Sequence, residues 1–305
     1  GFSFSTSFKE NPAKVRRFLE DNSLKYELTA PLFLGRSLHR LKTYLNGITV
    51  KAIAKIYRLD LFKSLYSTLQ SYFKNPKSLQ FFSRHATYNG SSPYQTPGIM
   101  SLIPHLEMYF GTYYPEGGMR SITESLYQLA MRHGVQFHFD EKVTQIDLHQ
   151  GKVIGISTAK GSYPFDIVVS NMDVVPTYRK LLTGIKAPEK TLAQERSSSA
   201  LIFYWGIQKT FKELDLHNIF FSDSYEEEFN CIFREKTLSE DPTVYVNISS
   251  KHTVSDAPEG GENWFVMINA PGNYGQNWEE LIDLSRERIL NKLSLLLGVN
   301  IKELI

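Results

Sequence analysis

The chain has 305 residues, of which 42% are hydrophobic and 22% charged, and its formal net charge is +2 at pH 7. This length suits one large domain or two ordinary ones, and the composition excludes collagen-like, coiled-coil and disordered proteins. The single cysteine, Cys231, excludes an internal disulfide and a CxxC site, so we interpret it as a buried thiol in a reducing compartment, and since the eight histidines have no zinc spacing we expect no metal.

The first third of the chain has the pattern of a helical region. Asn11 followed by Pro12 is a preferred helix start. Helices are expected at 11–24, at 36–72 with a break near Asn46-Gly47, and at 77–87. The turn-forming residues at 89–98 predict a loop.

Residues 30–105 combine positive charge with apolar residues at helical spacing. This segment has ten Lys and Arg but one acidic residue, Asp60. The cations inside the apolar stretch 38–73 include Lys51, Lys55 and Arg58. Such a surface is attracted to anionic lipid, so we expect peripheral docking on an anionic membrane through 36–77 by a cytoplasmic protein. A core-facing stripe with a solvated charged face is the alternative, and no signature supports a nucleic-acid partner.

After residue 110 the pattern changes from helix to strand. A helix is expected from about Ser121 to His133, where Gly134 ends it. Short strands, three of which could form a meander, are expected at 135–139, 142–149, 152–158 and 166–170. After a helical stretch at 173–182, longer aromatic strands are expected at 197–209, 243–251 and 263–271, and a last helix at 278–297.

Common catalytic motifs are absent from this sequence. No Gly-x-Gly pair occurs, so the 305 residues hold neither a GxGxxG fingerprint nor a P-loop. No GxSxG elbow is present, and no Ser/His/Asp triad is arranged by motif. The acidic run SYEEEFN (224–230) is interpreted as a solvated face.

The segment YPEGGM (114–119) contains two adjacent glycines, Gly117 and Gly118. Glycine adopts backbone angles closed to other residues and has no side chain to hold a ligand away, so a ligand could lie against this backbone. A plain tight turn is the alternative.

Several stretches, taken together and in order, resemble the bacterial phytoene desaturases and related carotenoid desaturases, which are FAD-dependent enzymes of the amine-oxidase-like fold. The matching stretches are GSSPYQTP (90–97), YPEGGM (114–119), KVTQI (142–146), VVSNMDVVPTYRKLL (168–182), LHNIFFS (216–222), DPTVYVNISSK (241–251) and APEGGENWFVMINAP (257–271). The resemblance implies an α+β flavoprotein: a helical substrate and membrane region at 1–110, an inserted part of the FAD-binding domain at 111–177, and a mixed β-sheet substrate region at 178–305.

The resemblance also implies roles for individual residues. Flavin contact is implied for Gly117, Gly118, Met119, Val143, Asn171 and Met172. Tunnel walls for a long apolar carotenoid are implied for Leu201, Phe203, Trp205, Trp264, Val266 and Ile268, with plain core packing as the alternative. Arg84 and His85 are candidate polar groups near the substrate, with structural roles as the alternative, and no catalytic acid or base is assigned.

Two features of the family do not occur in this chain: a GxGxxG unit at the start and a glycine-rich segment at the end. The chain is therefore expected to be the middle of a longer enzyme and to bind FAD poorly or not at all by itself, because the helix-terminus amides that stabilise the phosphate charge are missing. No obligate protein partner is evident. A retinol-saturase-like or amine-oxidase-like enzyme and a non-catalytic isoprenoid carrier are the alternatives, and the sequence does not identify the carotenoid.

Overall fold

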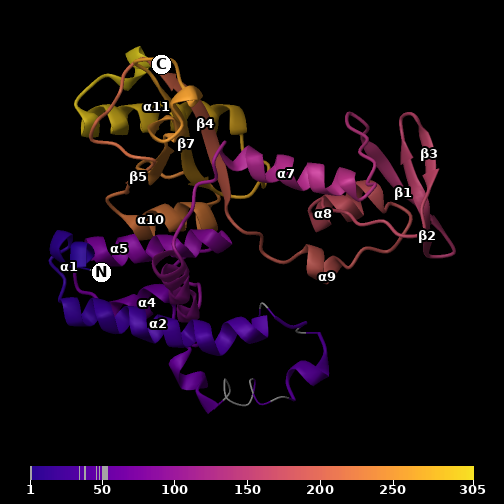
Figure 1. Cartoon of the computed structure of the whole chain (residues 1–305), viewed down its shortest axis with the longest axis horizontal. Helices are drawn as coiled ribbons and strands as arrows, with labels where there is room; N and C mark the ends of the chain where they lie inside the picture. Colours follow the sequence, from indigo (N-terminus) through magenta and orange to yellow (C-terminus); the bar gives the residue numbers. More distant parts are fainter. Residues whose placement is uncertain (1, 34, 38, 46, 48, 50–53) are drawn as a thin grey trace. The chain divides into compact units, whose positions relative to one another are not determined.

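The computed structural model describes residues 2–33, 35–37, 39–45, 47, 49 and 54–305. The chain divides into two compact units, the first formed by Gly1–Gly118 with Ser197–Ile305 and the second by Met119–Arg196 (Figure 1). The sequence predicts boundaries at 110 and 177. In the structure the chain passes from one unit to the other at Gly118/Met119 and at Arg196/Ser197. The helical first third and the C-terminal sheet thus belong to one unit.

The helical part of the first unit is built on α2 (Pro12–Phe33) and α5 (Pro76–Ser83). Its other helices are α1 (Phe2–Ser7), α4 (Leu65–Gln70) and α6 (Ile103–His105), with short helical turns η1 (Leu41–Thr43), η2 (Ile56–Arg58), η3 (Arg84–Asn89), η4 (Gly98–Leu102) and η5 (Leu106–Phe110). Phe18, Phe73 and Phe82 are buried at the centre of this part. The observed helix α2 is therefore longer than the helix predicted at 11–24. The helix predicted at 77–87 corresponds to α5 followed by η3.

A buried cation on α2, Lys25, contacts Asp60 and Ser101 in residues 30–105. The Lys25 side chain is 1% exposed, and its Nζ lies 2.8 Å from an Asp60 carboxylate oxygen and 2.8 Å from the Ser101 hydroxyl. The Ser101 hydroxyl in turn donates to the Asn22 side-chain oxygen at 2.6 Å. An unpaired buried ammonium is costly, so these contacts hold the three segments in one arrangement.

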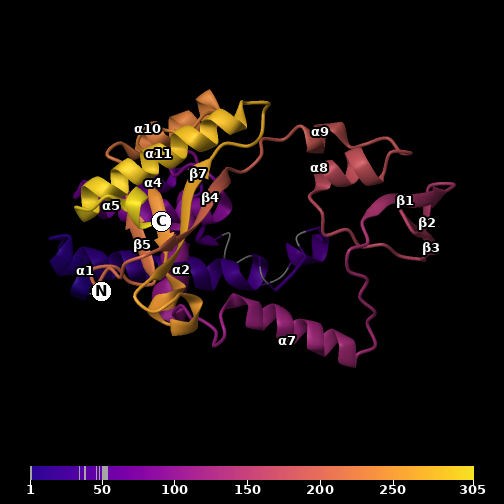
Figure 2. The same cartoon turned by 90° about the horizontal axis from the view of Figure 1, so that it is seen from above.

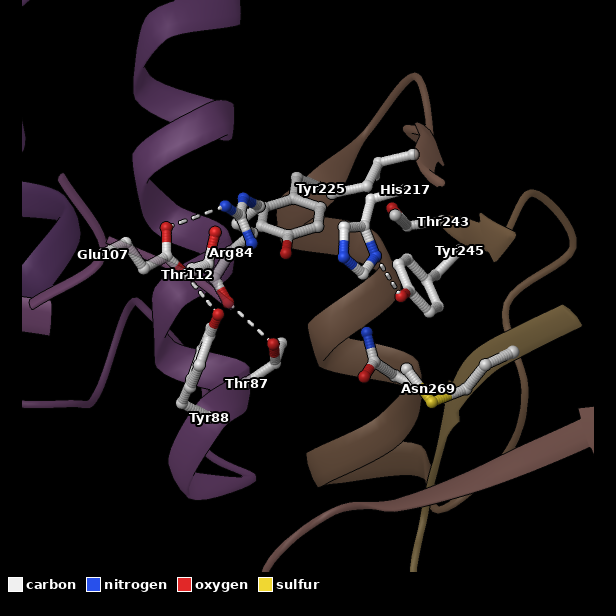
Figure 3. A pocket seen from close by; sticks show the side chains of 12 residues that line it. Arg84, Thr87, Tyr88, Glu107, Thr112, His217, Tyr225, Thr243, Tyr245 and Asn269 are labelled. Atoms are coloured by element: carbon white, nitrogen blue, oxygen red, sulfur yellow. Dashed lines mark hydrogen bonds and ion pairs between the residues drawn. The ribbon is translucent and has the colours of Figure 1, made fainter. Parts of the chain in front are cut away.

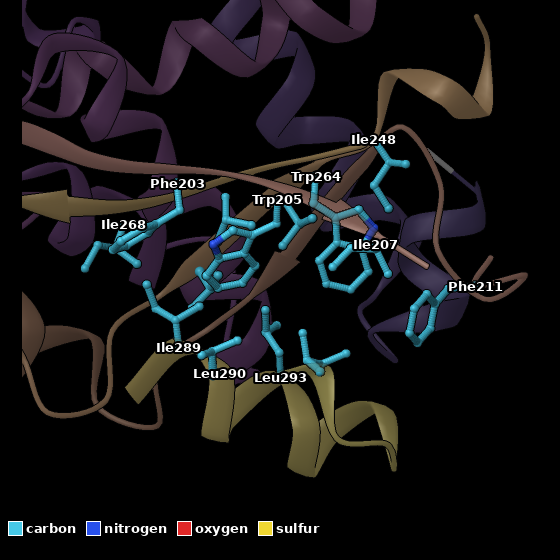
Figure 4. Packing of buried hydrophobic residues seen from close by; sticks show 14 of the residues in the cluster. Phe203, Trp205, Ile207, Phe211, Ile248, Trp264, Ile268, Ile289, Leu290 and Leu293 are labelled. Carbon is cyan, nitrogen blue, oxygen red and sulfur yellow. The ribbon is translucent and has the colours of Figure 1, made fainter. Parts of the chain in front are cut away.

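The sheet of the first unit has four antiparallel strands in the order β4-β7-β6-β5, with bounds β4 (Ser199–Ile207), β5 (His217–Phe220), β6 (Val244–Asn247) and β7 (Glu262–Ala270). One face packs against α11 (Trp278–Leu297), whose Ile289, Leu290 and Leu293 contact the sheet core (Figures 2 and 4). The helix α10 (Tyr225–Asn230) and the turn η7 (Cys231–Glu235) connect β5 to β6. The predicted strands and the last helix are confirmed, but β5 was missed.

The second unit contains α7 (Met119–Arg132) and an antiparallel meander of β1 (Val143–His149), β2 (Lys152–Thr158) and β3 (Gly161–Pro164). The short helices α8 (Val174–Pro176), η6 (Thr177–Leu181) and α9 (Glu189–Leu192) follow. The strands predicted at 135–139 and 166–170 are not formed in this structure, because these segments pair with no strand among the described residues. Their apolar side chains are exposed instead, with Ile167 80% and Val169 89% exposed.

Candidate functional site

A cavity of about 380 Å³ lies in the first unit between the helical part and the sheet (Figure 3). Its helical wall comes from η3, η5 and Thr112, and its sheet wall comes from β5, β6 and β7. The lining residues are Arg84, Thr87, Tyr88, Glu107, Thr112, His217, Ile219, Tyr225, Thr243, Tyr245, Met267 and Asn269. Polar groups from two separate parts of the fold therefore meet in one enclosed space, as in small-molecule sites.

The helical wall is organised around Glu107. Its carboxylate accepts hydrogen bonds from the Arg84 guanidinium at 3.3 Å and from the Tyr88 hydroxyl, and the His85 Nε2 lies 3.1 Å away. Burial alone would raise the pKa of this carboxyl, but the hydrogen bonds from His85 and Tyr88 and the neighbouring positive charges lower the pKa of Glu107 to about 2. Burial and the hydrogen bond to Glu107 raise the pKa of Tyr88. Glu107 is therefore an ionised group with partners on each side.

The two residues proposed as polar groups near the substrate take different positions. Arg84 lines the cavity, whereas His85 is fully buried behind it, with Nδ1 3.0 Å from the Phe82 carbonyl oxygen. Arg84 thus remains available to a ligand, while His85 positions Glu107. A catalytic role for either residue stays a prediction.

The sheet wall contains a hydrogen-bonded triplet of His217, Tyr245 and Asn247. The Tyr245 hydroxyl lies 2.7 Å from His217 Nδ1, and the two rings stack with centroids 6.0 Å apart. Asn247 Nδ2 lies 3.3 Å from the same ring nitrogen and donates to the Leu216 carbonyl oxygen at 3.0 Å. Burial raises the pKa of Tyr245, so its hydroxyl stays protonated at neutral pH.

A buried carboxyl, Glu228, lies behind the sheet wall. Its Oε2 accepts hydrogen bonds from the Thr243 hydroxyl at 2.6 Å and from the Ser222 hydroxyl at 2.9 Å. Burial raises the pKa of Glu228, although these hydroxyls and the Asn269 amide oppose the shift. Burial and the nearby Glu228 also raise the pKa of Tyr225 well above its ordinary value.

The prediction of a solvated face for SYEEEFN is therefore wrong at one of its three acids. Glu226 and Glu227 are exposed, but Glu228 is 1% exposed. One turn of α10 presents Tyr225 and Glu228 to the same side, since residues three apart share a helix face. The run of acidic residues gives no indication that the face of α10 with Tyr225 and Glu228 is buried against Thr243.

The residues proposed as tunnel walls lie on the opposite face of the sheet from the cavity. Phe203, Trp205, Trp264, Val266 and Ile268 are buried in the core beneath α11, and Leu201 packs against that core (Figure 4). This packing favours the core interpretation for all six. Met267 and Asn269, which alternate with Val266 and Ile268 along β7, line the cavity instead.

Apolar side chains continue from the cavity along the same face of the sheet. Met267 pairs across the strands with Ile202 on one side and Tyr245 on the other. The Phe265 ring lies 5.5 Å from the Tyr204 ring and 6.3 Å from the Tyr245 ring. We call these five residues the apolar strip. It is partly exposed, with Tyr204 78% and Ile202 38% exposed, and a contiguous exposed apolar surface of this kind is typical of a binding site.

The diglycine segment forms a tight turn. The Gly118 amide donates to the Pro115 carbonyl oxygen at 2.9 Å, and Gly117 has φ of +78°, the angle that the third residue of a type II turn requires. Gly117 is exposed and Gly118 is half-buried, with α7 beginning at the next residue, Met119. The turn accounts for the conformation of Gly117, and contact with a flavin stays a prediction.

The other residues proposed for the flavin lie in the second unit. Val143 is the half-buried first residue of β1, and Asn171 and Met172 are exposed just before Asp173, whose carboxylate caps α8 by accepting from the Val175 amide at 2.8 Å. These positions offer main chain for a cofactor to approach. They offer no glycine-rich phosphate loop, so the 305 residues fit a dinucleotide only in part.

The structure describes only part of residues 36–77, which we call the basic segment. Arg58 and Lys63 are exposed beside two exposed aromatic residues, Tyr57 and Phe62, the latter 94% exposed. Leu38, Asn46 and Lys51, which belong to the predicted amphipathic helices, lie outside the described residues. Among the helices that the structure describes, none has the length and apolar content needed to cross a membrane.

Comparison with known proteins identifies the family. A family model described as flavin containing amine oxidoreductase matches residues 3–292. The chain is 55% identical over 298 residues to a 1-hydroxycarotenoid 3,4-desaturase of Flavobacterium sp., covering 98% of this chain and 61% of that protein. It is 30% identical to a phytoene desaturase of Fusarium fujikuroi, covering 94% of this chain and 54% of that protein.

The fold has a counterpart among solved structures. An oxidoreductase from Methanosarcina mazei aligns with a TM-score of 0.53 at 16% identity, over 81% of this chain and 56% of that one. The chain thus spans between half and two thirds of the length of these three proteins. It belongs to the flavin containing amine oxidoreductase family, within the branch of the carotenoid desaturases.

Proposed function

We propose that the protein containing this chain is a flavin-dependent desaturase that removes two hydrogens from adjacent carbons of a long carotenoid. The observation that carries the proposal is the apolar strip, which leads along an open sheet face into the cavity. A long apolar chain would be removed from water on such a strip, at about 25 cal/mol per Å² of buried apolar surface. The 55% identity to a hydroxycarotenoid desaturase supports the same substrate class.

In this proposal the chain binds and orients the substrate, and the flavin of the complete protein supplies the hydride acceptor. Met267 and Phe265 hold the polyene against β7, and the Arg84–Glu107 pair closes the end of the cavity. Water is excluded from the apolar strip once the polyene covers it. Part of the flavin surface would come from Gly117, Gly118 and Met119, and part from Val143, Asn171 and Met172. The phosphate-binding loop for the flavin does not occur in these 305 residues.

The exposed apolar residues of the second unit support a cofactor domain completed by other segments. Phe139, Ile167 and Val169 stand on segments that have strand-like sequences but no strand partners among the described residues. Apolar strands of this kind are usual inside parallel sheets. We propose that strands of the same protein, outside these 305 residues, pair with them.

The test is desaturation by the complete gene product in cells that accumulate a 1-hydroxycarotenoid. We expect a product with two fewer hydrogens that absorbs at longer wavelength, because its conjugation is longer. Met267→Asp, which places a charge on the apolar strip, should abolish the product, whereas Leu295→Asp, at an exposed apolar position on α11, should not. A folded, flavin-loaded protein that binds carotenoid without oxidising it would instead indicate an isoprenoid carrier.

We also propose that the basic segment docks the protein on an anionic membrane. Exposed Tyr57 and Phe62 beside Arg58 and Lys63 combine apolar insertion with lipid attraction, and each cation near the surface adds about 1 kcal/mol. The charge reversals that test this are at Lys51, Lys55, Arg58 and Lys63. Binding to anionic liposomes should fall steeply, while the same reversal at Lys142, Lys152, Lys186 and Lys190 should leave it close to the original value. Equal loss in both sets would contradict docking through this segment.

A further inference from the structure

We infer that the cavity binds a hydroxyl group at the end of the polyene, through Tyr245 and His217. This inference rests on the proposed function, because it assigns the polar end of the substrate to one part of the site. It names two specificity-determining residues that the resemblance did not indicate.

The hydrogen bonds around His217 define which atoms are free for a ligand. The Asn247 amide is oriented by the Leu216 carbonyl oxygen, to which its nitrogen donates at 3.0 Å. The same nitrogen lies 3.3 Å from His217 Nδ1, and an amide nitrogen only donates, so this contact disfavours a proton on Nδ1. The neutral ring therefore carries its proton on Nε2, and the single lone pair of Nδ1 accepts from the nearer donor, the Tyr245 hydroxyl at 2.7 Å.

This arrangement leaves the His217–Tyr245 pair with one donor and one acceptor for a ligand. The Nε2–H group of His217 donates, and the Tyr245 oxygen, having given its proton to Nδ1, accepts. An alcohol needs both, since its oxygen accepts one hydrogen bond and its proton makes another. A ketone or carboxylate would use only the donor. The pair therefore matches a hydroxyl better than another oxygen group.

The Glu107 carboxylate of the helical wall does not compete for the hydroxyl. Glu107 accepts from Arg84 and Tyr88 and contacts His85 Nε2, so its oxygens are already engaged. The cavity of about 380 Å³ is also at the small end of ligand pockets, which span about 300–1,000 Å³. It accommodates the end of a polyene while the rest lies along the apolar strip, which begins at Tyr245 itself.

The substrates named for two relatives differ in whether they carry a hydroxyl. The Flavobacterium protein, 55% identical, is named for a substrate with a hydroxyl two carbons from the bond it desaturates. Phytoene, which gives its name to the 30% identical relative, is a hydrocarbon. A site that forms hydrogen bonds to a hydroxyl rejects the analogue lacking it, because its own polar groups are then left unpaired.

The test compares two carotenoids with the same polyene, one hydroxylated at its end and one not, as substrates of the complete flavin-loaded protein. The original protein should prefer the hydroxylated one, and Tyr245→Phe and His217→Phe should each lower the ratio of the two kcat/KM values by about tenfold or more. Tyr204→Phe, on the same sheet face but outside the cavity, is the matched control and should change both substrates alike. Binding of the two carotenoids, followed by their visible absorption, gives the same comparison for any inactive variant.

The outcomes separate the inference from the proposed function. An original protein that desaturates both carotenoids equally, or Tyr245→Phe and His217→Phe variants that keep its preference, would overturn the hydroxyl site and leave the desaturase proposal standing. An original protein that desaturates neither would overturn the proposed function. A preference that falls only in the Tyr245 and His217 variants is the expected result.

Discussion

Replacing Glu107 by glutamine should destabilise the protein at neutral pH by an amount that the ion-pair network predicts. The pKa of Glu107 is lowered from 4.5 to about 2, and one pKa unit corresponds to about 1.4 kcal/mol. The full difference is about 3 kcal/mol, and since the side chain is 20% exposed we expect about 2–3 kcal/mol. Glu107→Gln removes the charge that Arg84 and His85 contact, so the cavity wall should loosen with it.

The pH dependence follows from the direction of the shift. A carboxyl with a lowered pKa stabilises the folded state above its unfolded value near 4.5, and this contribution is lost as the pH falls toward about 2. Urea unfolding of the original protein should therefore show a fall in the free energy of unfolding across this window. Across the same pH window, the free energy of unfolding of Glu107→Gln should decrease by about 2–3 kcal/mol less than that of the original protein.

The control is Glu259→Gln, at an exposed carboxylate in the turn before β7, which should change stability by less than about 0.5 kcal/mol. Equal unfolding free energies for Glu107→Gln and the original protein at pH 7, with parallel curves down to pH 3, would refute the network argument. A loss at pH 7 without a change in slope would assign the effect to packing rather than to charge.

Three other outcomes are expected. As the pH rises from 5 to 8, the melting temperature of Glu228→Gln should rise relative to that of the original protein. The reason is that a buried carboxyl with a raised pKa destabilises the folded state once it ionises. Melting temperatures that change in parallel with pH would contradict this. Lys25→Met should lower the unfolding free energy in urea by about 3 kcal/mol, and adding Asp60→Asn should recover part of it; a loss under 1 kcal/mol would mean the pair is not buried in solution. The purified 305-residue chain should be colourless, and visible flavin absorption after gel filtration would show that it binds the cofactor unaided.

The sequence predicted those elements whose signals are local. The helix at 278–297 was predicted to the residue because leucines and isoleucines recur at helical spacing up to Gly298, which has the left-handed conformation of a helix end. The strands at 142–149 and 152–158 were found from their alternation and the turn between them. Such features depend on neighbours within a few residues.

The errors occur where a distant partner decides the structure. Residues 135–139 and 166–170 have strand composition, but a strand needs a neighbour to accept its hydrogen bonds, and the described residues provide none. Glu228 was misassigned for the same kind of reason, since its burial depends on Ser222 and on Thr243, the latter 15 residues further along the chain. Local charge density carries no information on such contacts.

The cavity wall, in contrast, was within reach of the sequence. Both faces of the sheet are rich in apolar residues, so composition alone does not distinguish the face that packs against α11 from the face that lines the cavity. On one face of β6 stand Val244 and Val246, which have no polar atom in their side chains, and on the other stand Tyr245 and Asn247. A face that buries itself permanently has no use for side chains that need hydrogen-bond partners, because each unpaired polar group costs about 1–3 kcal/mol. The face with interspersed polar groups is therefore the one expected to line a cavity, and period-2 alternation with that criterion selects it from the sequence.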